Sequence, residues 1–353
     1  MSKRKIRRRT RRLSSKRIII YMIVIAMVVC ADYLYHTFVS KSGEPTLLEQ
    51  IVDTYNAQVE GTKESKPKQV TPKQTEPKQN SPQAQSSSKQ SDTYRQGWAE
   101  LPVERENQDL LYAHHTLSNG TRNYSVCYSK SHHCPMWVAV PLHKSYKGEL
   151  KRKDSYNYDP KIAINHQISL KRSYGEYTRG HMLASSDRTV SEEANLQTFY
   201  VTNIAPQIQA GFNAANGAWN YLESFVEKQV CADTLYVVMG TLFKAYTDVD
   251  GMTIEPTQTT NRSDQKQVSV PTAYYQALLR TRSGKSGRSV MESSKEELKC
   301  AAFIVGHRSA KGRKPSRREM ISIEELERLT GVEFFANVAN APKSEAKSED
   351  WGL

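Results

Sequence analysis

The stretch Tyr177-Thr-Arg-Gly-His-Met182 carries the strongest local signal in the sequence. Arg179 can hold a phosphate in a fork of donors, and Gly180 lets backbone approach closely. His181 is the side chain whose ordinary pKa best suits proton transfer near neutral pH. Arg179, Gly180 and His181 together suit phosphate chemistry. A match of only three residues is weak evidence by itself, so its interpretation depends on the other motifs of the chain.

The charge of the chain is concentrated at its N-terminus. The 353 residues carry a formal net charge of +13, and residues 1–17 hold ten Lys or Arg with no acid, which leaves +3 for everything after Arg17. The overall charge therefore says little about the ligand of the folded part. A basic flank followed by an apolar segment is typical of an export signal or a membrane anchor.

The apolar segment 18–39 admits three interpretations. Residues 18–31 carry no charge, and apolar character resumes after Asp32. Counted to Val39, the segment is long enough for a span of about 20 residues, which favours an uncleaved transmembrane anchor with a cytoplasmic flank at 1–17. A signal sequence cleaved before Asp32 is the second interpretation, and a buried structural helix is the third. The first two place the rest of the chain on the extracytoplasmic side, periplasmic or extracellular.

The cysteine content agrees with export. Four cysteines follow the apolar segment: Cys127, Cys134, Cys231 and Cys300. An even number in an exported domain predicts two disulfides, and sequence separation favours pairing the first with the second and the third with the fourth. A metal site that uses His132 and His133 with the second cysteine lacks another ligand pair at zinc-finger spacing.

Composition divides the remainder into a linker, a domain and a tail. Residues 40–93 are predicted to be a disordered linker, because 61–93 is rich in Lys, Gln, Pro and Ser and has one Val as its single large apolar side chain. Globular composition extends over 94–342, and 343–353 is a polar tail.

The domain combines strands and helices without regular alternation. Strands are predicted at 136–141, 198–203, 234–240, 267–281 and 297–307. Helices are predicted near 216–230, with Asn216 as a possible cap, and at 320–329, with Ser322 as the cap. This order predicts an α+β fold with a mixed, largely antiparallel central sheet flanked by helices.

Two further motifs support the central stretch. One is Asn203-Ile-Ala-Pro-Gln207, and the other runs from Phe212-Asn213 to Trp219-Asn-Tyr-Leu-Glu223. Cutting a phosphodiester needs an activated water, cations that offset developing charge, and help for the leaving oxygen. Amide and carboxylate oxygens are donors that Mg²⁺ accepts beside several waters.

Together, the ordered motifs Tyr-x-Arg-Gly-His-x-x-Ala, Asn-Ile-x-Pro-Gln and Phe-Asn…Trp-x-x-Leu-Glu resemble the DNA/RNA non-specific endonucleases, which are ββα-metal nucleases. The resemblance spans about residues 95–340. It implies a ββα-metal active site and an endonuclease that hydrolyses DNA and RNA with little sequence preference. The implied cofactor is Mg²⁺, with Mn²⁺ as a possible substitute.

The resemblance also implies a role for each of six residues. These are His181 as general base, Arg179 as the grip on the phosphate, Arg152 as the cation that neutralises the transition state, Asn203 as support for the loop near the histidine, Glu223 as holder of a metal-bound water and Asn213 as the direct metal ligand.

The sequence departs from the family pattern at two places. Thr178 stands where the family commonly has Asp, and a hydroxyl does not replace a charge. Asn213 lies six residues before Trp219 rather than four, as if Ala214-Ala215 were inserted. Asn216 is therefore the alternative metal ligand, although Asn213 follows a phenylalanine as in the family.

Two rival functions remain open at this point. One is a non-catalytic, exported receptor that binds nucleic acid and whose departures record lost activity. The other is a phosphodiesterase that acts on a different exported phosphoester. Cleavage assays with and without metal distinguish the first from an endonuclease, and competition by oligonucleotides tests the second.

Overall fold

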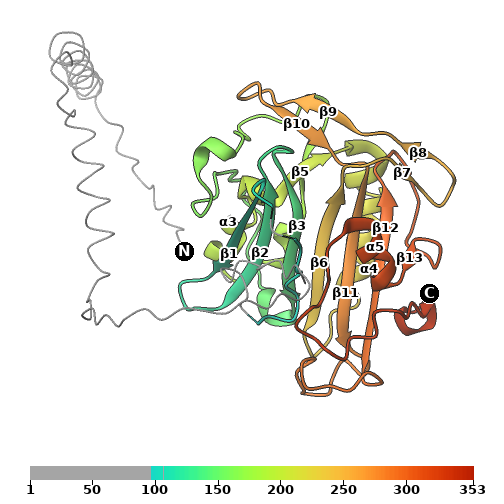
Figure 1. Ribbon diagram of the computed structural model, residues 1–353. Helices are drawn as coiled ribbons and strands as arrows, with labels where there is room; N and C mark the ends of the chain where they lie inside the picture. The colour runs from blue at the N-terminus through green and yellow to red at the C-terminus, as the bar shows by residue number, and fades with distance from the viewer. Residues whose placement is uncertain (1–96, 106) are drawn as a thin grey trace, which may run out of the picture. The chain divides into compact units, whose positions relative to one another are not determined.

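A computed structural model describes residues 97–353 with the exception of residue 106 (Figure 1). The predicted basic flank, anchor or signal, and linker, at 1–17, 18–39 and 40–93, lie outside the described residues. Within the described part of the chain, no helix has the length and apolar character that a membrane crossing requires.

A seven-stranded sheet forms the centre of the domain, in the order β1-β2-β3-β6-β11-β12-β13 (Figure 1). Every neighbouring pair is antiparallel. The strands are β1 (Leu110–Thr116), β2 (Arg122–Ser129), β3 (Cys134–Leu142), β6 (Leu235–Leu242), β11 (Ala273–Thr281), β12 (Leu298–Gly306) and β13 (Met320–Ile321). The predicted α+β class with a largely antiparallel central sheet is confirmed.

The central strands read as continuous apolar runs because both faces of the sheet are covered. Successive side chains of a strand point to opposite faces. In β11, Tyr274 and Leu278 therefore enter the core on one face, whereas Tyr275 and Leu279 enter the core on the other. All four are buried.

One helix packs on each face of the sheet (Figure 1). Helix α4 (Ala218–Glu227) buries Trp219 and Leu222 in the core that contains Tyr274. Helix α5 (Ile323–Thr330) buries Ile323 and Leu326 in the core of the opposite face. The prediction of Ser322 as its cap is confirmed, because the Ser322 side chain accepts a hydrogen bond from the Glu325 amide.

Helix α4 begins later than predicted. Its N-cap is Gly217 rather than Asn216. Asn216 adopts a left-handed backbone conformation (φ 66°), and its side-chain oxygen accepts a hydrogen bond from the Tyr221 hydroxyl at 2.8 Å. The asparagine thus ends the preceding turn, and the helix starts one residue after the glycine.

Shorter elements lie outside the main sheet. They are β4 (Thr178–His181), β5 (Ile204–Gln207), β7 (Tyr246–Thr247), β8 (Thr253–Ile254), β9 (Thr257–Thr260), β10 (Gln267–Val270), α3 (Glu192–Gln197), the π-type turn η7 (Gln209–Asn213) and 3₁₀ turns at 144–146, 164–166, 185–187, 201–203 and 348–351. The strand predicted at 198–203 is wrong. The Asn203 side chain donates to the Thr198 carbonyl at 2.7 Å and closes this segment into a turn, so the strand starts at Ile204.

The disulfide prediction is also wrong, because all four described cysteines are free. Cys127 and Cys134 lie on the neighbouring strands β2 and β3 but enter the cores on opposite faces of the sheet. Cys300 is buried in the core that contains Cys127, whereas the Cys231 thiol donates to the Asp233 carbonyl at 3.2 Å. The even number of cysteines does not reveal which face of the sheet each thiol occupies.

The polar segment 343–353 packs against the domain. Trp351 is buried, and Lys299 lies 4.5 Å from the centre of its ring. Asp350 forms an ion pair with Arg282. The end of the described chain thus contributes an aromatic side chain to the core that α4 shares with the sheet.

Replacing Leu222 by alanine should lower the free energy of unfolding by about 2–5 kcal/mol, because this fully buried side chain fills the contact between α4 and the sheet. Denaturant titration measures the loss. Lys228→Ala, at the exposed end of the same helix, is the control and should change the value by less than about 0.5 kcal/mol. Equal losses would show that α4 is not anchored through Leu222.

Candidate active site

A cavity of about 590 Å³ lies beside β4 and α4. It collects five of the six residues singled out in the sequence: Arg152, Arg179, His181, Asn213 and Glu223. They come from a long loop, a short strand, a turn and a helix that are far apart along the chain. The sixth residue, Asn203, does not line the cavity.

The pairing of β4 with β5 brings two of the motifs together. Thr178 lies opposite Gln207, and His181 lies opposite Ile204. A Cβ atom on Gly180 would overlap the Gln207 side chain, so this position requires glycine for close approach. Gln207 in turn accepts a hydrogen bond from the Asn213 side chain.

His181 is buried, with 8% of its surface exposed, and its ring packs edge-on against Phe199 at 4.8 Å between centroids. Its Nε2 atom has no hydrogen-bond partner among the described residues. Burial, and after it the positive charges of Arg152 and Arg179, lower the pKa of His181 to about 3. The imidazole is therefore neutral near pH 7 and able to accept a proton.

Two guanidinium groups flank the histidine. Arg179 lies 3.9 Å from the centre of the Tyr156 ring and donates to the Leu170 carbonyl at 2.9 Å, which fixes its position. Arg152 is more exposed and pairs with Asp154 at 2.7 Å. An exposed ion pair of this kind is weak and easily exchanged for another anion. Arg179 is thus held in place, whereas Arg152 can exchange Asp154 for another anion.

Asn203 holds the backbone that follows the histidine. Its Oδ1 atom accepts from the Leu183 amide at 2.9 Å, and its Nδ2 atom donates to the Leu183 carbonyl at 3.0 Å. The Asn203 carbonyl accepts from the Met182 amide at 2.9 Å. The side chain is fully buried and acts on the loop rather than in the cavity.

The two candidate metal ligands occupy different environments. Asn213 lines the cavity. Its Nδ2 atom donates a hydrogen bond to Gln207, and its Oδ1 atom accepts none from the described residues. Asn216 does not line the cavity, and its Oδ1 atom is already used by Tyr221. The geometry favours Asn213 as the residue with a free oxygen.

Glu223 is the carboxylate that α4 contributes to the cavity. Burial, and after it the negative charges of Asp187 and Glu227, raise its pKa to about 8. A cation beside this carboxyl group would relieve the cost of ionising it. No group of three His, Cys, Asp or Glu able to hold a metal exists in the described part of the chain. One amide oxygen and one carboxylate therefore fit a cation that keeps most of its waters, as Mg²⁺ does.

Other residues that line the cavity had no role in the sequence analysis. These are Leu150, Asp154, Tyr156, Ala184, Ser185, Ser186, Thr189, Gln209 and Asn220. The position of Asp154 two residues after Arg152 is the one local signal that could have identified it. Thr178, which was noted as a departure, lines the cavity as well.

A family model described as DNA/RNA non-specific endonuclease matches residues 107–341. The chain belongs to the DNA/RNA non-specific endonuclease family. The predicted resemblance is thereby confirmed.

Curated relatives agree with this membership. Human mitochondrial nuclease EXOG is 30% identical over 221 residues, which cover 61% of this chain and 56% of the relative. Human mitochondrial endonuclease G is 24% identical over 220 residues, which cover 61% of this chain and 68% of the relative. A Nostoc nuclease is 26% identical over 219 residues, which cover 61% of this chain and 72% of the relative. The chain spans between a half and two thirds of the EXOG relatives from human and zebrafish.

A solved structure shows the same fold. A chain of the crystal structure of an EndoG/EndoGI complex aligns with a TM-score of 0.50 at 24% identity. The alignment covers 64% of this chain and 86% of that chain.

A buried histidine outside the cavity fastens the turn that carries Asn213. The Nε2 atom of His307 accepts from the Ile208 amide at 2.9 Å, and its Nδ1 atom donates to the Pro271 carbonyl at 2.8 Å. This arrangement requires a neutral ring. Burial lowers the pKa of His307 to about 4.

The His307 contacts predict a loss of stability in acid. In the unfolded chain the histidine takes up a proton below about pH 6.5, whereas the folded form resists it until about pH 4. Stability should therefore fall as the pH drops through this window, and His307 should account for about 2 kcal/mol between pH 7 and pH 4.5. Denaturant titrations at both pH values measure it.

The matched variant is His307→Gln, whose side chain can accept and donate at similar places without titrating. Between pH 7 and pH 4.5, the free energy of unfolding of this variant should fall by about 2 kcal/mol less than that of the parent. An unchanged slope would contradict the assignment of this pH dependence to His307.

Proposed function

We propose that the chain is a metal-dependent endonuclease that hydrolyses phosphodiester bonds of DNA and RNA with little sequence preference. The observation that supports this best is the buried, neutral His181, whose Nε2 atom is unpaired at a cavity with two guanidinium groups, the Asn213 amide oxygen and the Glu223 carboxyl group. Membership of the DNA/RNA non-specific endonuclease family supports the same proposal independently.

Each side chain has a chemical task in this proposal. His181 accepts the proton of the attacking water, and its neutral state at pH 7 leaves it ready to do so. Arg179, held by its ring and carbonyl contacts, grips the phosphate, and Arg152 exchanges Asp154 for the charge that develops in the transition state. Asn203 keeps the histidine segment in place.

Asn213 and Glu223 are the residues that would hold a hydrated Mg²⁺, the first through its amide oxygen and the second through a coordinated water. When bound, this cation supplies charge stabilisation for the leaving oxygen. Mn²⁺ accepts the same oxygen donors. The raised pKa of Glu223 supports this assignment, because a nearby cation favours its ionised form.

The proposed lack of sequence preference follows from the chemistry of the lining. The named groups address phosphate and metal, whereas the sequence of a nucleic acid is carried by the edges of its bases. A side chain that reads a base edge is not needed for hydrolysis. The same cavity can therefore accept DNA and RNA.

We further propose that the enzyme is exported and tethered to a membrane. Support comes from the basic residues 1–17 and the apolar residues 18–39 alone. The 40–93 linker would then hold the domain clear of the surface. A cleaved signal at the same place leaves the proposed activity unchanged.

Replacing His181 by alanine should reduce the rate of plasmid and RNA cleavage in Mg²⁺ by about 10²–10⁴-fold, because it removes the general base. Agarose gels with plasmid and a fluorescent RNA measure the rates. His132→Ala is the control, since this histidine lies outside the cavity and stacks on Phe243. Wild-type rates in both variants would overturn the assignment of the base.

The same assay separates the enzyme from the rival receptor. An endonuclease cuts in Mg²⁺ and stops when EDTA is added. A receptor with a degenerate site binds nucleic acid in filter-binding assays but does not cut under either condition.

Replacing Asn213 by alanine should raise the Mg²⁺ concentration needed for half-maximal cleavage by at least about tenfold, because loss of even an indirect metal contact commonly costs 10–100-fold in affinity. Asn216→Ala should change this concentration far less, because its oxygen bonds Tyr221 rather than facing the cavity. Metal titrations of the cleavage rate measure both. The reverse order of effects would make Asn216 the ligand.

A further inference from the structure

The connection from β12 to β13 contains the most basic segment of the described chain. The basic loop, Lys311-Gly-Arg-Lys-Pro-Ser-Arg-Arg318, has five Lys or Arg among eight residues and no acid. Everything after Arg17 carries only +3 in total. The loop is therefore a local concentration of positive charge in a chain whose other charges after Arg17 nearly balance.

The basic loop lies directly against the turn that carries Asn213. The Ala310 amide donates to the Gly211 carbonyl at 2.9 Å, and the Gly312 amide donates to the Asn216 carbonyl at 2.8 Å. Lys311 lies between these two bonds. Gly211 has a left-handed conformation (φ 80°), and a Cβ atom there would overlap the Ser309 side chain, so the two backbones are closely packed.

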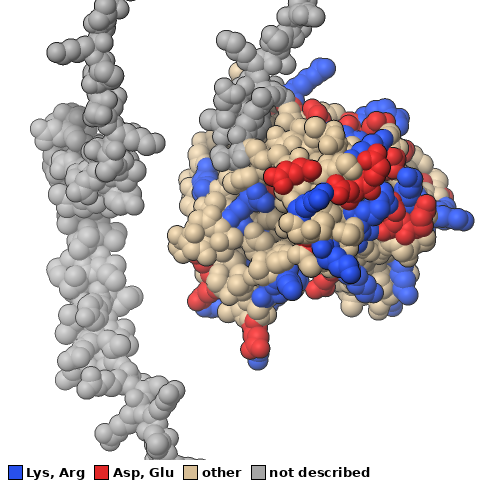
Figure 2. Space-filling view, turned by 90° about the horizontal axis from the view of Figure 1, so that it is seen from below, with Lys and Arg blue, Asp and Glu red and all other residues tan. Residues whose placement is uncertain are grey.

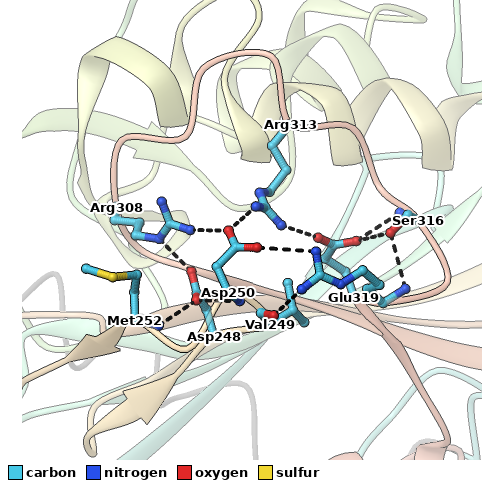
Figure 3. Close-up of polar contacts among 9 residues, drawn as sticks. Asp248, Val249, Asp250, Met252, Arg308, Arg313, Ser316 and Glu319 are labelled. Atoms are coloured by element: carbon cyan, nitrogen blue, oxygen red, sulfur yellow. Dashed lines mark hydrogen bonds and ion pairs between the residues drawn. The ribbon is translucent and has the colours of Figure 1, made fainter.

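Three acidic residues hold the arginines of this region in place (Figure 3). Asp250, from the turn between β7 and β8, accepts from Arg308 at 2.6 Å and from Arg313, and it pairs with Arg318 at 3.3 Å. Asp248 accepts from the first of these arginines at 2.5 Å. The loop is therefore ordered by ion pairs before any ligand binds.

Glu319 completes this network from the other end of the loop. It accepts from Arg313 at 2.8 Å and from the Ser316 amide and hydroxyl at 3.1 and 2.6 Å. Its side chain is almost entirely buried. Three arginines are thus matched by three acids, so the network itself is close to neutral.

The remaining cations of the loop are unmatched. Lys311, Lys314 and Arg317 are exposed, and none forms an ion pair with a carboxylate of the described residues. Lys314 lies 5.8 Å from the centre of the Tyr221 ring on α4. The neighbouring residue of that helix, Asn220, lines the active-site cavity. Lys314 therefore lies beside the helix that carries Asn220 to the cavity, and Lys311 lies against the turn that carries Asn213.

We propose that the basic loop is a second phosphate-binding surface, which holds the nucleic acid backbone beside the bond to be cut. This inference rests on the proposed nuclease function. Each strand of a duplex carries one phosphate per about 3.4 Å of helix axis, so a strand that reaches the cavity presents further phosphates to the adjoining loop. The preformed loop would bind them at little ordering cost.

Binding of this kind has a distinct signature. Contacts to phosphate release counterions, so the logarithm of the affinity falls with the logarithm of salt concentration by about 0.9 for each phosphate neutralised on duplex DNA. The contacts carry no base information. The basic loop should thus add affinity for long strands of any sequence.

The test uses the full chain with His181→Ala, so that bound nucleic acid stays intact, and EDTA in the buffer. Binding of a labelled 30-base-pair duplex of arbitrary sequence is measured from 50 to 200 mM salt. Adding Lys311→Gln, Lys314→Gln and Arg317→Gln should reduce the salt slope by about 2 to 3 and weaken binding about tenfold or more at 100 mM salt. The basic residues 1–17 are common to all variants and cancel in the comparison.

The control removes three positive charges elsewhere, through Lys285→Gln, Arg288→Gln and Arg328→Gln. The first two lie in the connection between β11 and β12, at the opposite end of those strands from His307, and the third lies on α5. The face of the domain seen from below mixes Lys and Arg with Asp and Glu (Figure 2). This control should keep the parental slope within about 0.5.

The outcomes separate the two proposals. Equal slopes and affinities for the loop variant, the control and the parent would overturn the role of the basic loop, even if the wild type cuts DNA. Absence of cleavage by the wild type would instead overturn the nuclease function, whatever the slopes show. Lys314→Gln alone, expected to lower the slope by about 0.9, repeats the test if the triple variant melts at a lower temperature than the parent.

Discussion

The close contact between Gly180 and Gln207 determines how the parts of the site meet. Because position 180 has no Cβ atom, the Gln207 side chain can cross it and reach Asn213. The same antiparallel pairing sets His181 at the end of β4, opposite Ile204. A single glycine thus joins the histidine strand to the turn that carries the amide oxygen. This explains in physical terms why arginine, glycine and histidine occur in immediate succession.

Polar groups in the domain fall into two kinds. Asn203 and the fully buried Arg188 donate hydrogen bonds to backbone carbonyls. Each thereby stabilises the loop in which it lies. His181 and Glu223 instead carry a pKa shifted by burial and face a cavity. Shifting a pKa by burial costs stability, and groups of this kind cluster at functional sites. Arg179 is intermediate, since it is fixed by neighbours yet still lines the cavity.

The parts that sequence alone could predict are those with strong local signals. The runs that became β6, β11 and β12 are long and apolar because both faces of the sheet are covered, and Ser322 marks the start of α5 by its own hydrogen bond. The six candidate site residues were found through the resemblance to the endonuclease family, and five of them line one cavity. Three features were not predictable from sequence. The separate pairing of β4 with β5 and the turn before Ile204 depend on contacts that local sequence does not encode. The free state of Cys127 and Cys134 depends on which face of the sheet each side chain occupies.

The electrostatics of the domain are local rather than global. A net charge of +3 after Arg17 would attract a polyanion only weakly, yet the acids Asp248 and Asp250 are placed so that they order arginines instead of cancelling the exposed lysines nearby. The basic loop and the Asn213 turn also share backbone hydrogen bonds, which fix their relative position in the structure. A phosphate held at the loop would therefore be held at a fixed distance from the proposed metal ligand. Affinity and positioning then come from the same rigid contact, and neither requires the recognition of a base.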